Sequence, residues 1–67
     1  MPYINLQITQ KATREQKATI VAEFTNTLIQ VLGKKPEHIH IVIQEIEDDN
    51  WGFRGLLTSE LRKQAAK

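Results

Sequence analysis

The feature that most constrains the fold is an amphipathic segment placed between two segments of alternating hydrophobicity. Residues 14–32 carry apolar side chains at the three- and four-residue intervals of one helix face. Residues 3–9 and residues 38–46 alternate apolar and polar side chains, which is the period of strands covered on one face. This order predicts an α/β (α+β) fold with a β-α-β core, in which the two strands are parallel and the helix covers their isoleucine-rich faces.

Local signals define both ends of the predicted helix. Thr13 and Gln16 have the spacing of a capping box, in which each side chain bonds the main-chain N–H of the other residue. Gly33 suits the left-handed conformation that follows many helices, and Pro36 confirms the stop. The polar face of the first strand is expected either to be solvated or to line a subunit interface.

The last third of the chain lacks a long periodic segment. Residues 51–55, Trp-Gly-Phe-Arg-Gly, predict a tight turn or a small hairpin because two glycines stand three apart. Residues 57–66 are predicted to form a short helix with Leu57 and Leu61 on one side. Arg62, Lys63 and Lys67 are expected to belong to an exposed tail.

The chain is short for the structure it encodes. Its 67 residues are expected to form one domain, residues 1–67. A compact chain of this length exposes roughly 4,300 Å², so folding buries only about 60% of the surface that the unfolded chain exposes. No cysteine is present to form a disulfide. Two strands and one helix also leave a sheet face and both sheet edges open. We therefore expect a homo-oligomer.

Charge and hydropathy narrow the class of partner. Nine Lys and Arg residues oppose eight Asp and Glu residues, so the clustered positive charge of a nucleic-acid binder is missing. The sequence has no run of about 18 apolar residues, so no transmembrane helix is predicted. The first residues lack the basic region and apolar core of a signal peptide. We expect a cytoplasmic protein that binds neither nucleic acid nor a membrane.

Pro2 is the residue with the most distinctive potential chemistry. Methionine before a small second residue is commonly removed, and its removal would turn the Pro2 nitrogen into a secondary amine. An amine in an apolar pocket has a lowered pKa and can act as a general base near neutral pH. The alternative is that Pro2 is merely tolerated where a strand begins.

Several short motifs, taken in order, resemble the 4-oxalocrotonate tautomerase family of the tautomerase superfamily. They are Met1-Pro2-Tyr3-Ile4, Glu15-Gln16-Lys17 at the helix start, the segment Ile39–Glu45, and Trp51-Gly52 in a turn. The resemblance runs over about residues 1–58. It implies a protomer that assembles through its sheets, with a hexamer favoured and a dimer or trimer possible. It also implies a cofactor-free proton transfer by Pro2 in a site at a subunit junction.

The sequence departs from the family pattern at two positions where family members have substrate-binding arginines. Their positions hold Ala12 and His40, whereas the aromatic position of the pocket holds Trp51. An anionic transition state needs fixed donors or positive charge. Five residues are candidates for this substrate-binding role: His40, Trp51, Lys11, Arg14 and Arg54.

Each candidate also has a simpler interpretation. His38 and His40 are expected on one strand face and Glu45 on the other, so no metal site is predicted and the histidines could be polar interface residues. Arg54 could be a solvated turn residue, and Trp51 could pack in a core or a subunit interface.

The sequence thus predicts an isomerase that converts enol and keto forms of a 2-hydroxy-dienoate or an aryl 2-oxo acid, a small-molecule substrate. Pro2 would act as base and acid in turn, without a cofactor. The alternatives are related dehalogenase or decarboxylase chemistry, and an inactive or promiscuous oligomeric domain of the same fold, which the two replaced arginines would allow.

Overall fold

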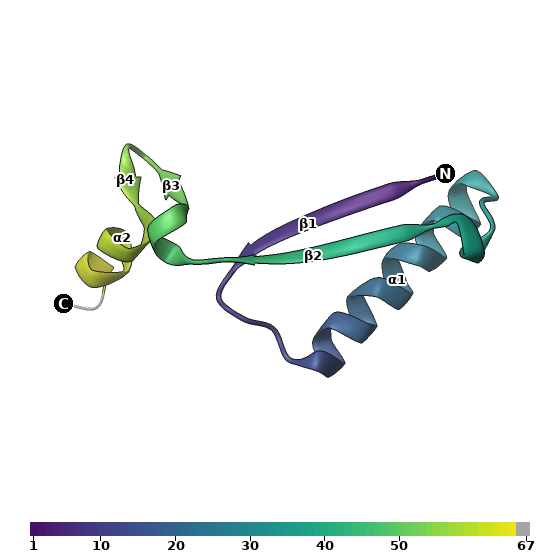
Figure 1. Cartoon of the computed structure of the whole chain (residues 1–67), viewed down its shortest axis with the longest axis horizontal. Helices are drawn as coiled ribbons and strands as arrows, with labels where there is room; N and C mark the ends of the chain where they lie inside the picture. The colour runs from purple at the N-terminus through teal and green to yellow at the C-terminus, as the bar shows by residue number, and fades with distance from the viewer. Residues whose placement is uncertain (66–67) are drawn as a thin grey trace.

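The computed structural model describes residues 1–65, in which a strand–helix–strand unit is followed by a small C-terminal extension (Figure 1). In chain order the elements are β1 (Tyr3–Thr9), α1 (Arg14–Leu32), the 3-10 helix η1 (Pro36–His38), β2 (His40–Ile46), the 3-10 helix η2 (Asp48–Asn50), β3 (Gly52–Phe53), β4 (Leu56–Leu57) and α2 (Thr58–Ala65).

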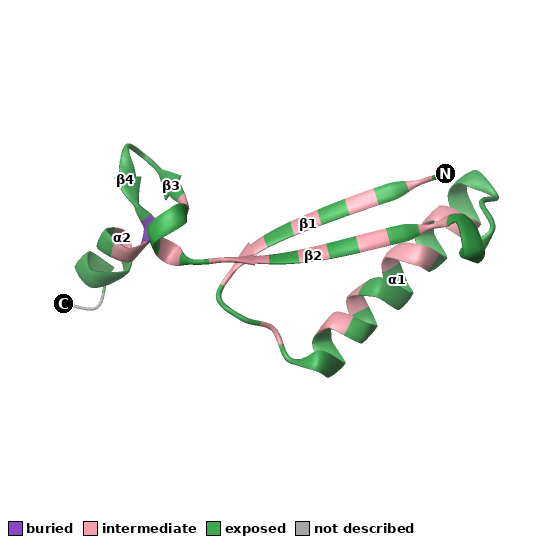
Figure 2. Cartoon of the chain, viewed as in Figure 1, coloured by how far each residue is buried: buried purple, intermediate pink, exposed green. Residues whose placement is uncertain are grey.

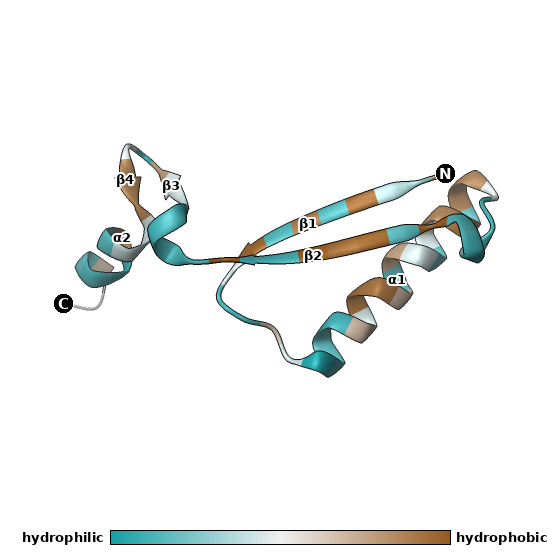
Figure 3. Cartoon of the chain, viewed as in Figure 1, coloured by the Kyte–Doolittle hydropathy of each residue, from teal (hydrophilic) through white to brown (hydrophobic). Residues whose placement is uncertain are grey.

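Strands β1 and β2 form a parallel pair, as predicted. Ile4 lies beside Ile41 and Leu6 beside Ile43, so the apolar residues of the two strands share one face. Exposure alternates along both strands, with Ile4, Leu6, Ile8, Ile41 and Ile43 half-buried and the residues between them exposed (Figure 2). The same alternation appears in the hydropathy of the two strands (Figure 3), and α1 runs beside the pair. The predicted α+β architecture is confirmed.

Helix α1 has the predicted bounds, and both of its predicted caps are present. The Gln16 main-chain N–H donates to Thr13 Oγ1 at 3.1 Å, and the Thr13 N–H donates to Gln16 Oε1 at 2.8 Å. Gly33 adopts the left-handed conformation, with φ 65°, and closes the helix. Within residues 1–65, neither helix has an apolar stretch long enough to cross a membrane.

The predicted start of the second strand is wrong by two residues. Pro36 opens a 3-10 turn in which the His38 N–H donates to the Lys35 carbonyl at 2.9 Å and the Ile39 N–H to the Pro36 carbonyl at 3.2 Å. Proline at the first position of a helical turn has a suitable φ and loses no bond. β2 therefore begins at His40, and the prediction that His38 and His40 share one strand face is wrong.

We call residues 48–65 the C-terminal arm. The predicted hairpin is confirmed: β3 and β4 are antiparallel, and a two-residue turn joins them. In that turn Arg54 has φ 58° and Gly55 has φ 78°, the positive angles of the turn that suits hairpin twist. The predicted helix 57–66 is corrected, because Leu57 belongs to β4 and α2 begins at Thr58. Residues 66 and 67 lie outside the described residues.

The chain is extended and has little interior of its own. Its radius of gyration is 15.7 Å, against about 11 Å for a compact chain of this length. Its accessible surface is 5392 Å², about a quarter more than the roughly 4,300 Å² expected. No hydrophobic side chain among the described residues is buried. Among residues 1–65 the one buried residue is Thr58, which is 5% exposed. One chain alone leaves much of its apolar surface uncovered.

Candidate active site

Pro2 lies at the end of the sheet where both strands begin. It is half-buried and continues the alternation of β1, so it lies on the same side of the strand as Ile4. Its carbonyl oxygen accepts a hydrogen bond of 3.1 Å from the His40 main-chain N–H. Beside Ile4, a hollow of about 270 Å³ is lined by Phe24, Thr27 and Leu28 of α1. The helix side of β1 next to Pro2 is therefore mainly apolar at Ile4.

His40 and Tyr3 form a second, exposed group at the same end of the sheet. They are neighbours in the parallel register and belong to the face that α1 leaves open. Tyr3 is 61% exposed, and its hydroxyl accepts a hydrogen bond from Asn5 Nδ2 at 3.1 Å. Sequence reasoning did not single out Tyr3 for the site. Its place on the polar face next to Pro2 was the signal that could have done so.

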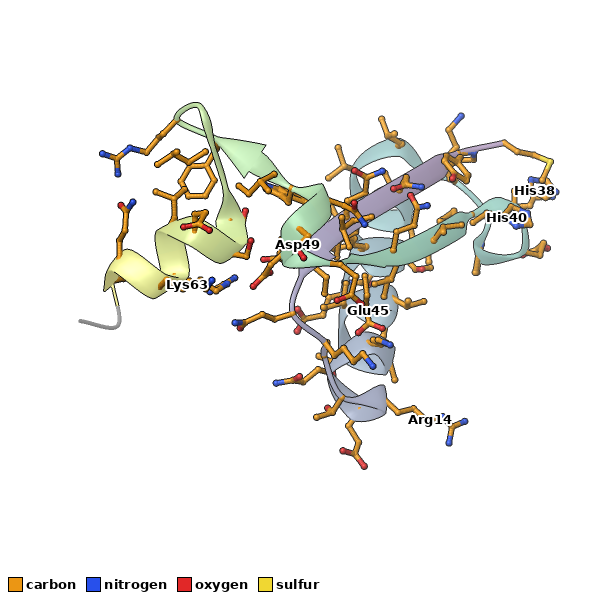
Figure 4. The ribbon with its side chains drawn as sticks, turned by 60° about the vertical axis from the view of Figure 1, so that its left-hand side comes forward. Arg14, His38, His40, Glu45, Asp49 and Lys63 are labelled. Carbon is orange, nitrogen blue, oxygen red and sulfur yellow. The ribbon has the colours of Figure 1, made fainter. Side chains whose placement is uncertain are left out.

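Lys11 and Arg14 lie at the opposite end of the sheet from Pro2. Lys11 follows β1 and Arg14 is the first residue of α1, and both are exposed. The seven residues of β1 separate them from Pro2 by about 20 Å of extended chain. Figure 4 shows Arg14 at the free end of α1 and His40 at the distant end of the sheet.

Trp51 and Arg54 belong to the C-terminal arm, which lies at the end of the molecule opposite the N-terminus (Figure 1). Trp51 is half-buried and lines a hollow of about 390 Å³ together with Thr9 and Phe53. Arg54 is exposed in the hairpin turn. One chain therefore brings the main chains of Pro2 and His40 together, with the His40 side chain on the open face of the sheet. The other four candidate residues lie at the opposite end of the sheet or in the arm.

Glu45 has a role that sequence reasoning did not assign. It lies on the helix side of β2, opposite to the exposed face that holds His40, as predicted. Its Oε2 accepts a hydrogen bond from the Ala12 N–H at 3.0 Å, and its Oε1 lies 3.2 Å from Lys17 Nζ. The Ala12 N–H first, and then Lys17, hold the pKa of Glu45 below its usual value of 4.5. Glu45 thereby fixes the connection that carries Lys11. The sequence signal for this role was an acidic residue, Glu45, among the isoleucines of the helix side of β2.

The titratable residues that could ligate a metal are spread along the molecule. Figure 4 shows His38 and His40 near one end, Glu45 beside α1 and Asp49 in the C-terminal arm. Among residues 1–65, no three His, Cys, Asp or Glu side chains are grouped closely enough to hold a metal ion.

Comparison with known proteins defines the class of this protein. The Tautomerase enzyme family matches residues 2–60. Probable tautomerase K2 of Dickeya dadantii is 42% identical over 67 residues, covering 98% of this chain and all of the relative. The 2-hydroxymuconate tautomerase of Comamonas testosteroni is 25% identical, covering 91% of this chain and 97% of the relative.

Solved structures agree with the sequence comparison. The crystal structure of YwhB, a homologue of 4-oxalocrotonate tautomerase, has a TM-score of 0.83 and 27% identity, covering 88% of this chain and 97% of that one. The chain belongs to the tautomerase family, and the resemblance to its 4-oxalocrotonate tautomerase branch is confirmed. It is an isomerase, as the sequence predicted.

Proposed function

We propose that the amino group of Pro2, freed by removal of Met1, is the general base and acid of this tautomerase. While Met1 is attached, the Pro2 nitrogen is an amide and has no basic lone pair. Pro2 is a small second residue, and methionine before such a residue is commonly removed. The half-buried position of Pro2 supports the proposal, because partial removal from water favours the neutral form of an amine.

The proposed reaction moves one proton and requires no cofactor. The Pro2 amine removes the proton from the hydroxyl of a 2-hydroxy-dienoate or of the enol of an aryl 2-oxo acid. The electron pair of that O–H bond forms the carbonyl group, and the carbon–carbon double bonds shift along the conjugated chain. The protonated amine then returns the proton to carbon, so the base is regenerated. β1 holds the nitrogen in place during both steps.

The developing negative charge must be met by donors on the protein. His40 is the candidate nearest in the structure, because its main chain is bonded to the Pro2 carbonyl. This Pro2–His40 contact is the observation that carries the proposal. We propose that His40 takes over substrate binding from the replaced arginine. Lys11, Arg14, Trp51 and Arg54 contribute only from neighbouring chains, since each lies far from Pro2 in its own chain.

We further propose that the protein is a homo-oligomer, with a hexamer favoured over a dimer or trimer. The excess accessible surface and the lack of a fully buried hydrophobic side chain among residues 1–65 support assembly. Apolar side chains on the outer sheet face and in the arm, such as Val42, Phe53 and Leu57, are 40–48% exposed. Assembly would cover them and would bring the arm of one chain to the Pro2 of another.

One observation keeps a second function open. Both positions at which the family has substrate-binding arginines hold other residues, Ala12 and His40. This favours a substrate less charged than a dicarboxylate, such as an aryl 2-oxo acid. It also leaves room for a promiscuous or inactive domain, or for dehalogenase or decarboxylase chemistry, which begins from a protonated proline.

The test combines intact mass with an activity panel on the same preparation. Mass spectrometry is expected to show the loss of Met1. Ultraviolet assays with 2-hydroxymuconate, phenylenolpyruvate and a haloacrylate are expected to show the fastest turnover on one of the two enols. A mature protein that retains Met1, or one that turns over neither enol, would contradict the proposal.

A further inference from the structure

One face of α2 packs toward the rest of the chain. Thr58, Leu61, Arg62 and Ala65 follow the three- and four-residue spacing of a single helix face, and all four line the hollow of about 390 Å³. Thr9 at the end of β1 and Trp51 and Phe53 of the arm also line the hollow. Arg62 was expected in an exposed tail; it is exposed, but it belongs to α2 and lines this hollow.

Two residues one turn apart on this face make the polar contacts. The N–H and the hydroxyl of Thr58 both donate to the Trp51 carbonyl oxygen, at 2.8 and 2.6 Å, and Thr58 is the buried residue of the described chain. Arg62 Nε donates to Asp48 Oδ2 at 2.7 Å, and Arg62 Nη2 donates to Thr9 Oγ1 at 3.1 Å. α2 thus links the Trp51 main chain to the end of the sheet.

These contacts restrain the angle between the arm and the sheet. The chain enters the arm directly from β2, so without another attachment the arm could pivot between Ile46 and Asp48. The Arg62–Thr9 bond is a second attachment, made to the neighbouring strand β1. Two attachments on adjacent strands fix an orientation that one attachment leaves free. Arg62 also lies beyond residues 2–60, the part of the chain that the family shares.

We propose that Arg62 is a positioning residue for the active site, because it holds the arm at the angle that presents Trp51 to Pro2 of a neighbouring chain. This rests on the proposed function, in which Trp51 forms part of another chain's pocket. Arg62 acts through Thr58 and the Trp51 main chain and does not touch the substrate.

The contacts of Arg62 favour a positioning role over a large role in stability. The Arg62 and Asp48 side chains are 44% and 27% exposed, and ion pairs with this much solvent contribute little to folding stability. The charge-assisted bond still has a well-defined geometry, which orients the groups that it joins. The Arg62→Ala variant is therefore expected to fold and to retain its assembly.

The first experiment reports on the arm without any assay of activity. Trp51 is the only tryptophan of the chain, so the fluorescence of the full-length protein reports on it alone. Arg62→Ala is expected to increase acrylamide quenching of Trp51. Lys63→Ala is the matched control, since Lys63 is the next residue of α2 and reaches Glu60 only at 4.0 Å on the surface. Its quenching is expected to equal that of the unmodified protein.

The second experiment connects the arm to turnover. In Arg62→Ala, KM for the best enol is expected to rise about tenfold, since small displacements of substrate-positioning groups have effects of this size or larger, while kcat changes less. In a Trp51→Ala background, Arg62→Ala is expected to have no further effect on KM. Arg62→Lys, which retains the charge without the forked geometry, is expected to restore KM only in part.

The two readouts separate this inference from the proposed function. Equal quenching in Arg62→Ala and Lys63→Ala, or additive effects of Arg62→Ala and Trp51→Ala on KM, would overturn the positioning role of Arg62. Full activity of a Met1-free Pro2→Ala variant would instead overturn the proposed function. In that case increased quenching in Arg62→Ala would still support the attachment of the arm through Arg62.

Discussion

The His40 main-chain N–H donates a 3.1 Å hydrogen bond to the Pro2 carbonyl oxygen. This bond extends the parallel ladder by one step beyond Tyr3, the first residue of β1. It fixes the residue that would carry the basic amine relative to the first residue of β2. Because the bond uses the main chain of His40, its imidazole side chain remains available for a ligand on the exposed face of the sheet.

Substitution of His40 tests the binding role of its imidazole. His40→Ala keeps the main-chain bond to Pro2 and removes the side-chain donor. A hydrogen bond to a charged group contributes about 1.5–3 kcal/mol, so kcat/KM for a 2-oxo acid enol is expected to fall about 10- to 150-fold. Steady-state kinetics would measure this. His38→Ala is the control, because His38 lies in η1, and its kinetics are expected to be unchanged.

An arginine at the same position tests the substrate class. His40→Arg introduces the fork that binds a carboxylate with two hydrogen bonds. The ratio of kcat/KM for a dicarboxylate enol over an aryl enol is expected to rise. If neither His40→Ala nor His40→Arg changes the kinetics with any enol, His40 has no part in binding the substrate.

Glu45 is expected to make the stability of the fold sensitive to acid. Its pKa is lowered in the folded chain, mainly by the Ala12 N–H and then by Lys17. A lowered pKa stabilises the folded state above the ordinary value of 4.5, and this contribution is lost as the pH falls through the folded value. Glu45→Gln is therefore expected to lower the midpoint of urea unfolding at pH 7, with a difference that shrinks below pH 4.5.

The control for this pH series is Glu47→Gln, because Glu47 is exposed just beyond β2. Its difference from the unmodified protein is expected to be small at every pH. An equal effect of Glu45→Gln at pH 7 and at pH 3 would show that the contacts of its carboxylate do not stabilise the fold.

The elements with local sequence signals were predicted well. β1 and α1 have their predicted bounds because a period of two and a capping box are properties of neighbouring residues. The start of β2 was missed because Pro36 directs the chain into a 3-10 turn despite the continued alternation through His38. Leu57 was wrongly assigned to the helix. It pairs with Gly52 through a turn that depends on the positive φ angles of Arg54 and Gly55, and the spacing of apolar residues does not reveal such angles.

The site was less predictable than the fold, since it depends on contacts between distant residues. The nearness of Pro2 and His40 follows from strand register, which alternation alone does not specify. The role of Arg62 requires contacts across 14 and 53 residues of sequence, with Asp48 and Thr9. The separation of Trp51 from Pro2 depends on the position of the C-terminal arm, which lies at the end of the molecule opposite the N-terminus (Figure 1). The roles of the candidate residues and the cytoplasmic location stay predictions.

The cap of α1 offers a test of stability independent of function. Thr13→Ala removes the acceptor of the Gln16 N–H and is expected to lower the free energy of unfolding by about 1 kcal/mol. Thr19→Ala serves as control, because the Thr19 hydroxyl bonds the Glu15 carbonyl within the helix and alanine has the higher helix propensity. Urea unfolding at one fixed protein concentration would compare them. Equal losses would argue against the capping box as a source of stability.

Assembly makes a prediction about mass in solution. Light scattering at micromolar concentration is expected to give about six times the 7.7 kDa of one chain. Val42→Lys, which places a charge on the exposed sheet face, is expected to shift the mass toward smaller species and to reduce turnover in parallel. A fully active monomer would contradict the proposal that the site is completed between chains.

The central claim is that the Pro2 amine transfers the proton, and the most direct measurement is the turnover number of Pro2→Ala. With Met1 removal verified by mass, this variant has a primary amine without the proline ring at the same position. Its kcat for enol ketonisation is expected to fall by at least about 100-fold, the size of a general-base contribution, while its assembly is unchanged. A kcat equal to that of the unmodified enzyme would contradict the account.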